Sequence, residues 1–454
     1  MDTNKLIKKY NIPAPRYTSY PTVPFWQQEQ IASNDWFEAV KKTFDISNDT
    51  EGVSLYLHMP FCEKLCTYCG CNKRITVNHR VEEPYIEALM KEWDTYLKVF
   101  GSKPNIKEVH IGGGTPTFFS PENYMKLFGY IQSTSNYMEG FDFSFEGHPN
   151  NTTYEHLKAF KELGFTRVSY GVQDFDLKVQ QTINRIQPYE NVKRATEDAR
   201  SLGFTSVNFD LVYGLPFQSI EVIENTIRKV SELMPDRIAF YSYAHVPWVS
   251  PGQRAYTEAD LPSDDYKRAL YERGKSMLLE LGYEEIGMDH FALDGDKLLQ
   301  AHKDRTIHRN FMGYTTNNTE LLVGLGCSSI SDAKIAYAQN IKKVEDYQKA
   351  IEADSHALTK GHLLNDSDLL LKQAILDLIC KEELVLTNEI KSTLTDDDWN
   401  KLKDFQAEEV LAIHDDKVSM TEMGMTFIRN VCMVFDQRLK DSQRERGNLF
   451  SKSI

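Results

Sequence analysis

The stretch VSLYLHMPFCEKLCTYCGC, residues 53–71, joins a strand-like pattern to a dense group of cysteines. Its first seven residues are mostly apolar, aromatic or β-branched, which is typical of a buried β-strand. Cys62, Cys66, Cys69 and Cys71 follow at once, so four of the chain's seven cysteines stand in one loop. In parallel sheets, sites lie at the carboxyl ends of the strands. The stretch therefore predicts both a first sheet strand and a thiol-rich site at its end.

The same pattern of a short strand followed by an amphipathic helix recurs along the chain. One helical segment carries Ile86, Leu89 and Trp93 on a single stripe, and another begins with an N-cap serine, Ser120, before proline. The predicted strands are 53–59, 108–114, 141–147, 167–173, 206–214 and 237–245. Six such units predict an α/β fold, a partial (β/α)6 barrel that is two units short of a complete eight-unit barrel.

Segments of different character flank these units. The stretch PAPRYTSYPTVPFW (13–26) is rich in proline and aromatic residues, and VLAIHDDKVSMT (410–421) has the pattern of a hairpin. From about residue 346 the sequence becomes helical and highly charged. We therefore expect an N-terminal arm over 1–45, the barrel with a C-terminal extension over 46–345, and a smaller helix-rich domain over 346–454.

Composition narrows the possible partners. The 454 residues are 41% apolar and 26% charged, with a formal net charge of −14 and no dense block of Lys and Arg. This balance disfavours nucleic acid and anionic membranes as partners. Neither a signal peptide nor an apolar run of about 18 residues is visible. We expect a cytoplasmic monomer, in which clustered cysteines indicate a metal site in preference to disulfides.

The spacing C-x3-C-x2-C lets three thiolates meet one face of a metal cluster, and it favours iron–sulfur over zinc. Structural zinc needs four ligands, often as two separate C-x2-C pairs, and no second pair is present. Zinc nevertheless stays an alternative, with Cys71, His58 or His79 as a further ligand. The last three cysteines stand alone in apolar stretches, which indicates buried packing. Three cysteines would leave one iron of a four-iron cluster open to a cofactor.

With these cysteines after the first strand and HIGGGTP (110–116) after the second, the chain resembles the radical S-adenosylmethionine (SAM) superfamily. Longer matches narrow the resemblance to the oxygen-independent coproporphyrinogen III oxidases, also called coproporphyrinogen dehydrogenases. They include PRYTSYP (15–21), RVSYGVQDF (167–175), NFDLVYGLPFQ (208–218), IGMDHFA (286–292) and HRNFMGYTT (308–316). Together they extend the resemblance over nearly the whole chain.

The resemblance implies a set of site residues. Cys62, Cys66 and Cys69 would hold a [4Fe–4S] cluster, and Cys71 would lie close without being a ligand. Two SAM molecules are implied. The positions matched to the first are Tyr56, Gly113, Glu146 and Ile330, and those matched to the second are Tyr68, Gly114, Thr115, Gln173, Arg185, Asp210 and Ala244. The chain departs from the common family pattern at Tyr68, at Ile186 and at Gly147-His148, and we interpret His148 as a structural or solvated histidine and not a catalytic one.

The implied reaction is the oxidative decarboxylation of two propionates of coproporphyrinogen III to the vinyl groups of protoporphyrinogen IX. A 5′-deoxyadenosyl radical from SAM would carry it out, so no side chain is expected to act as the catalyst. The sequence has no second cluster motif or flavin signature, and we expect an external one-electron donor such as flavodoxin.

The four carboxylates of this tetrapyrrole need local cations in an acidic protein. The candidates are Arg16, Arg254, Arg305, His308 and Arg309. Two alternatives are a haem-binding chaperone of the same superfamily branch and a radical SAM methyltransferase. Cys71, the PRYTSYP arm and HRNFMGYTT favour the oxidase.

Overall fold

The structure is a computed structural model that describes residues 3–26, 31–442 and 449–453. The remaining residues, which belong to the ranges expected for the arm and the C-terminal domain, lie outside it. In the described part of the chain, the framework is one twelve-stranded sheet. The six predicted strands are its parallel centre, in the order of the sequence: β1 (Val53–Met59), β4 (Asn105–Gly113), β5 (Asn136–Gly147), β6 (Arg167–Gln173), β7 (Ser206–Tyr213) and β8 (Arg237–Ser242).

Further strands extend both edges of this centre. On one side β13 (Leu321–Leu325) pairs in parallel with β1, followed by the antiparallel strands β14 (Ile330–Ala333), β15 (Ala336–Asn340) and β16 (Leu358–Leu363). On the other side β10 (His290–Ala292) and β9 (Glu284–Ile286) pair antiparallel beyond β8. The sheet thus continues past residue 345, where the sequence indicated a boundary, because β16 supplies the hydrogen-bonding partner of β15.

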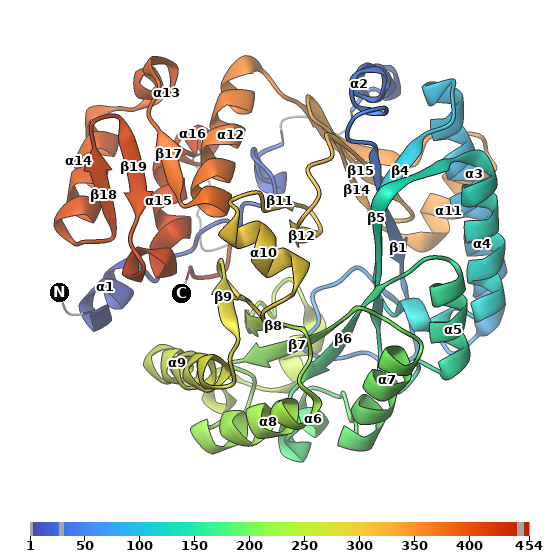
Figure 1. Ribbon diagram of the computed structural model, residues 1–454, viewed down its shortest axis with the longest axis horizontal. Coiled ribbons are helices and arrows are strands. Elements are labelled where there is room, and N and C mark those ends of the chain that lie inside the picture. The colour runs from blue at the N-terminus through green and yellow to red at the C-terminus, as the bar shows by residue number, and fades with distance from the viewer. Residues whose placement is uncertain (1–2, 27–30, 443–448, 454) are drawn as a thin grey trace.

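Helices cover the outer face of the sheet (Figure 1). They are α3 (Glu82–Phe100), α4 (Pro121–Thr134), α5 (Tyr154–Glu162), α6 (Leu177–Thr182), α7 (Tyr189–Ser201), α8 (Ile220–Leu233) and α9 (Asp264–Glu280). The predicted start of α4 is present, since the Ser120 side chain accepts a hydrogen bond from the Asn123 backbone. Outward side chains of the strands, such as Val109, Phe143 and Phe145, are fully buried in the main core against these helices.

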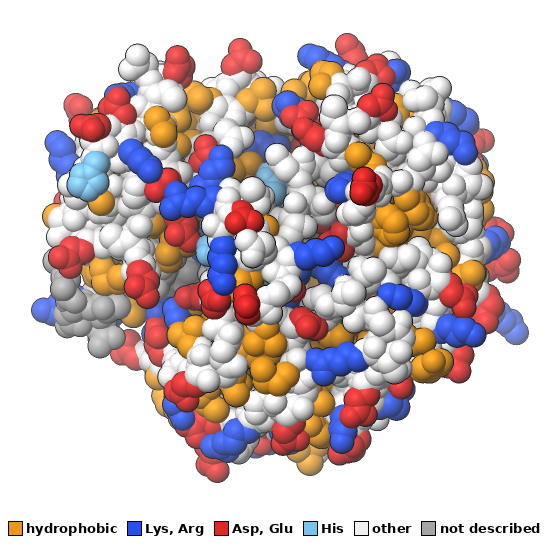
Figure 2. All heavy atoms as spheres, viewed as in Figure 1, with side chains coloured by type: hydrophobic (Ala, Val, Ile, Leu, Met, Phe, Trp, Pro, Cys, Tyr) orange, Lys and Arg blue, Asp and Glu red, His pale blue; other side chains and the backbone are white. Residues whose placement is uncertain are grey.

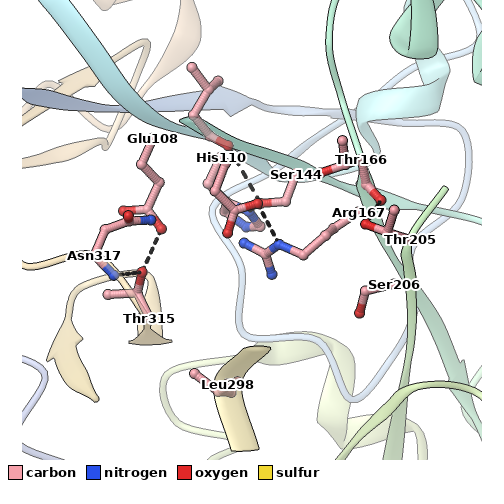
Figure 3. Close-up of polar contacts among 12 residues, drawn as sticks. Glu108, His110, Ser144, Thr166, Arg167, Thr205, Ser206, Leu298, Thr315 and Asn317 are labelled. Atoms are coloured by element: carbon pink, nitrogen blue, oxygen red, sulfur yellow. Dashed lines mark hydrogen bonds and ion pairs between the residues drawn. The ribbon is translucent and has the colours of Figure 1, made fainter. Parts of the chain in front are cut away.

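The inward side chains of the same strands are polar. Because successive side chains of a strand face opposite sides, Glu108 and His110 of β4 share the inner face with Ser144 of β5. Figure 3 shows this interior: Glu108 is joined to Thr315, and Arg167 extends from β6 toward Ser144 and His110. The Thr315 hydroxyl donates to Glu108 over 2.6 Å. A barrel with such an interior can hold polar ligands.

The N-terminal arm packs against the C-terminal elements (Figure 1). Arg429 donates to the backbone carbonyl of Pro15 over 2.9 Å, and the Tyr17 hydroxyl donates to Asp436 over 3.1 Å. The arm contains α1 (Thr3–Tyr10) and α2 (Ser33–Ser47). The C-terminal helices are α11 (Val344–Glu352), α12 (Asp366–Lys381), α13 (Asn388–Thr393), α14 (Asp396–Ala407), α15 (Ile428–Phe435) and α16 (Gln437–Asp441). The predicted hairpin is present as β18 (Leu411–His414) and β19 (Lys417–Met420), beside β17 (Glu383–Val385).

Short elements complete the chain: β2 (Phe61–Cys62), β3 (Arg74–Ile75), α10 (Lys297–Lys303), β11 (His308–Asn310) and β12 (Gly313–Thr315). On the face shown in Figure 2, acidic and basic side chains are interspersed and do not separate into large regions of one sign. None of the described helices combines the length and apolar content that crossing a bilayer requires.

Candidate active site

The cysteine loop begins at the carboxyl end of β1, and two short strands, β2 and β3, hold its two ends together. β2 and β3 pair in parallel, with Phe61 opposite Arg74. His58 of β1 lies 2.9 Å from the carbonyl oxygen of Asn72, and the ammonium of Lys73 donates to the carbonyls of Cys69 and Cys71 over 3.1 and 3.2 Å. These contacts hold the loop against the strand ends.

The loop forms one wall of a cavity of about 620 Å³ at the carboxyl ends of the strands. The residues predicted for the site that line it are Cys62, Cys66, Cys69, Tyr68, Gly113, Gly114, Thr115, Glu146, Gln173, Arg185, Asp210 and Ala244. They come from the first two strand ends, from β5, β6 and β7, from the loop after α6 and from the segment after β8. Residues far apart in the sequence thus meet in one space.

The three predicted thiol ligands suit a cluster better than a single ion. Thr115 donates to the Cys62 sulfur over 3.3 Å, and Arg185 approaches the Cys66 sulfur to 3.6 Å. Burial raises the pKa of Cys62 to about 11, and the Thr115 hydrogen bond offsets part of that shift. No three His, Cys, Asp or Glu side chains in the described ranges converge as ligands of one metal ion. A four-iron cluster binds each thiolate on a different iron, and three cysteine thiols on one loop at the cavity wall are a donor set that fits it.

The glycine-rich segment lies tightly against the end of β1. Gly113 has a φ of +113°, and a Cβ there would stand 2.7 Å from the His58 ring. A Cβ on Gly114 would stand 2.7 Å from the backbone of Pro60. The Gly113 backbone donates to Glu146 over 3.2 Å. Only glycine lets the backbone pass this close, and the Gly114 N–H donates to the Met59 carbonyl over 2.7 Å, which fastens the segment to the end of β1.

Another wall of the cavity carries the guanidinium group of Arg185 and the carboxyl group of Asp210. Arg185 donates to the carbonyl of Gly171 over 2.6 Å, while its buried Nε has no hydrogen-bond partner among the residues that the structure describes. Asp210 accepts hydrogen bonds from Ser169 and Asn208 over 3.1 and 2.9 Å. Burial, together with the nearby negative charge of Glu146, raises the pKa of Asp210 to about 7. Polar groups such as these, whose hydrogen bonds or charge the protein does not fully satisfy, are typical of sites that contact a ligand.

Two residues predicted for the first SAM lie outside the cavity lining. The Tyr56 ring stacks on His110, with 6.1 Å between the ring centroids, and the Tyr56 hydroxyl lies 3.0 Å from His58. Ile330 begins β14 and is half-buried. Tyr56 therefore borders the Glu146 side of the site, since His110 lies 3.5 Å from Glu146.

The five candidate substrate cations separate into different regions, and none of them lines the cavity. Arg16 pairs with Asp289 at 2.9 Å and lies over the ring of Tyr241, a cavity-lining residue. Arg309 donates to the Arg16 carbonyl and stacks on Tyr314. The other three point elsewhere: Arg254 bonds the Pro247 carbonyl, Arg305 pairs with Glu383, and burial lowers the pKa of His308 to about 4 and keeps it neutral.

The cavity also contains residues that sequence reasoning missed. Tyr241 lies inside the predicted strand 237–245, and its inward position follows from the two-residue period. Gln253 and Asn184 contact the backbone of the cysteine loop, at Tyr68 and Leu65 respectively, and no sequence signal identifies them. His148, interpreted from sequence as structural, lines the cavity, where burial and the nearby Arg185 lower its pKa.

Comparison with known proteins places this geometry in a family. The sequence profile of the radical SAM superfamily matches residues 56–230. The oxygen-independent coproporphyrinogen III oxidase of Pseudomonas aeruginosa is 36% identical over 99% of this chain and 98% of its own length. The Escherichia coli protein of that name is 35% identical, again over 99% of this chain and 98% of its own length.

A solved structure agrees with these relatives. The coproporphyrinogen III oxidase HemN from Escherichia coli, described as a radical SAM enzyme, superimposes with a TM-score of 0.87. The two chains are 34% identical, and the match covers 96% of this chain and 98% of that one. The likeness therefore includes the arm and the C-terminal elements as well as the barrel. The chain belongs to the oxygen-independent coproporphyrinogen III oxidases, a family of radical SAM enzymes.

Proposed function

We propose that this chain converts two propionates of coproporphyrinogen III into the vinyl groups of protoporphyrinogen IX. The observation that carries the proposal is the single cavity in which three cysteines face Arg185, Asp210 and Gln173, in a chain of this family. Bound [4Fe–4S] cluster and SAM supply a 5′-deoxyadenosyl radical, which can remove hydrogen from an unactivated carbon. The protein's own side chains bind, orient and exclude water.

The cysteines would hold the cluster, and the surrounding groups would orient SAM. Gly113 lies where the methionyl end of a first SAM would approach, and its close packing against the His58 ring leaves no room there for a side chain. Arg185 suits a carboxylate, because its buried guanidinium keeps an unpaired donor. Asp210 suits ribose hydroxyls or an amino group as an acceptor when it is ionised. These groups support the assignment of a second SAM to this wall.

Arg16 and Arg309 are the cations we propose for the substrate's carboxylates. They lie together behind Tyr241, at the junction between the arm and β11–β12. The Nε of Arg309 is buried, and no described residue offers it a hydrogen-bond acceptor. A propionate reaching past Tyr241 would satisfy this donor and compete with Asp289 for Arg16. Arg254, Arg305 and His308 lack such a position, and we do not assign them to the substrate.

We further propose that the chain is a cytoplasmic monomer. We also propose that it receives electrons from an external carrier such as flavodoxin, because its one thiol-rich loop provides a site for only one cluster. The relatives at 35–36% identity are named as oxidases, which favours that activity over a haem chaperone or a methyltransferase.

The test is anaerobic incubation of reconstituted protein with coproporphyrinogen III, SAM and dithionite, followed by product analysis. Protoporphyrinogen IX and 5′-deoxyadenosine are expected together. Haem binding without SAM cleavage would support the chaperone instead, and a methylated product would support the methyltransferase.

A further inference from the structure

The cysteine loop and the two segments beside it form an outer wall of the protein, in which Lys64, Leu65 and Cys71 are exposed. The segment 246–256 lies directly on the backbone of the cysteine loop: Ser250 donates to the Cys69 carbonyl over 3.3 Å, and Gln253 donates to the Tyr68 carbonyl over 3.1 Å. On the other side, Thr67 donates to the Ile183 carbonyl over 2.9 Å, and Asn184 donates to the Leu65 carbonyl over 2.7 Å. The segments 246–256 and 177–187 therefore flank the loop.

This outer wall exposes large apolar side chains. Leu65 is 39% exposed, Trp248 is 59% exposed and Val249 is 70% exposed. None of the three lines the cavity, whereas their neighbours Cys66, Cys69 and Val246 do. A Cβ on Gly252 would lie 3.7 Å from Leu65, so the loop carrying Trp248 reaches Leu65. Grouped apolar exposure of this kind marks an interaction surface.

The charge of the wall is opposite to that of the whole chain. The segments 62–74, 177–187 and 246–256 contain six basic residues, Lys64, Lys73, Arg74, Lys178, Arg185 and Arg254, against one acidic residue, Glu63. The chain as a whole has 66 acidic and 52 basic residues. Lys64, Lys178 and Arg254 are exposed. A negatively charged protein that approached this molecule would be attracted here and repelled by most of the remaining surface.

We propose that this wall, made of Leu65, Lys178, Trp248, Val249 and Arg254, is the docking surface for an acidic one-electron carrier protein. The inference rests on the proposed function, which requires an external reductant. A carrier seated here would approach the cluster ligands through one loop, without entering the cavity. It would also leave the cavity free for SAM and substrate during electron delivery. The apolar centre with a basic rim matches the usual anatomy of a transient interface.

The test compares two reductants, because dithionite is small and needs no docking surface. The double charge reversal Lys178→Glu with Arg254→Glu is expected to raise the KM for reduced flavodoxin by about tenfold at low ionic strength. Activity with dithionite should stay within about twofold of the unchanged protein. Added salt should reduce the flavodoxin-driven rate of the unchanged protein and have little effect on the variant.

A matched control reverses Lys158 of α5 and Lys403 of α14, both exposed and outside the three segments. Trp248→Ser tests the apolar centre independently of charge and should also raise the KM for flavodoxin while sparing the dithionite rate. Equal losses in the control and the test variant, or no change in the KM for flavodoxin, would overturn the docking surface. Absence of dithionite-driven activity in the unchanged protein would instead refute the proposed function, so the two failures are distinguishable.

Discussion

Replacing Asp210 by Asn should change the pH dependence of stability. In the unfolded chain an Asp carboxyl ionises with a pKa of about 3.9, whereas burial and Glu146 raise the pKa of Asp210 to about 7 in the fold. The folded protein thus retains this proton to higher pH than the unfolded chain does. The contribution of the carboxyl to stability is greatest below pH 4, is lost as the pH rises to 7, and is constant above that.

The size of the change in the free energy of unfolding follows from the shift in the pKa of Asp210. About three pKa units correspond to about 4 kcal/mol, of which up to about 3 kcal/mol is lost between pH 5 and 7. Asp210 faces the cavity, where solvent screens its charge. We therefore expect about half of that effect, about 1.5 kcal/mol. An Asn carbonyl oxygen can still accept from Ser169 and Asn208, and the neutral amide removes the repulsion between Asp210 and Glu146.

The assay is urea unfolding of the anaerobic protein without added SAM, at pH 5 and pH 8. Asp210→Asn should be more stable than the unchanged protein at pH 8 by about 1.5 kcal/mol more than it is at pH 5. Asp294→Asn is the control, because its side chain is 95% exposed. An equal difference at both pH values, or a loss of stability confined to pH 8, would refute the proposed cause of the shift.

Three further outcomes are expected. Changing any one of the three predicted cluster cysteines to Ala should abolish iron and sulfide in the reconstituted protein, whereas Cys71→Ala should retain both, as measured by iron and sulfide analysis. Gly113→Ala should lower SAM affinity by at least tenfold in equilibrium binding, because the added Cβ meets the His58 ring and the φ of +113° is strained for alanine. Arg309→Ala should raise the KM for coproporphyrinogen III by about tenfold or more, whereas Arg305→Ala should leave it unchanged, as measured in steady-state kinetics.

The barrel centre was predictable because each strand carries its signal locally. The run of residues 53–59 and the cysteines after it define where the first strand ends, and the glycines after β4 define the second end in the same way. All these ends meet at one edge of a parallel sheet, so the cavity lining followed from them. The extension of the sheet by β16 was not predictable, because its sequence LTKGHL has no apolar, β-branched run and lies where the chain becomes helical and charged.

The candidate substrate cations show that residues close together in the sequence need not share one environment in the fold. Arg305, His308 and Arg309 lie within five residues, yet they reach three environments. Arg305 has a φ of +57° and pairs with Glu383, a residue of β17. His308 and Arg309 follow each other in β11, so their side chains face opposite sides of the strand. Only the tertiary structure, which brings the arm against β11, places Arg309 beside Arg16.

The two halves of the barrel interior differ in how their charges are paired, and this difference locates the ligands. At the amino ends of the strands, Arg167 pairs with Asp142 and Arg237 pairs with Asp296, each at 2.7 Å. Such pairing compensates buried charge and leaves no strong attraction for an added ion.

At the carboxyl ends, Arg185 keeps an unpaired Nε and the pKa of Asp210 is raised to about 7. A buried donor and an incompletely stabilised carboxylate are costly in the empty cavity and become satisfied by a polar, charged ligand. The electrostatics of this interior therefore favour a ligand that carries both positive and negative charges, as SAM does, at the same end of the barrel to which the cysteine loop brings the cluster.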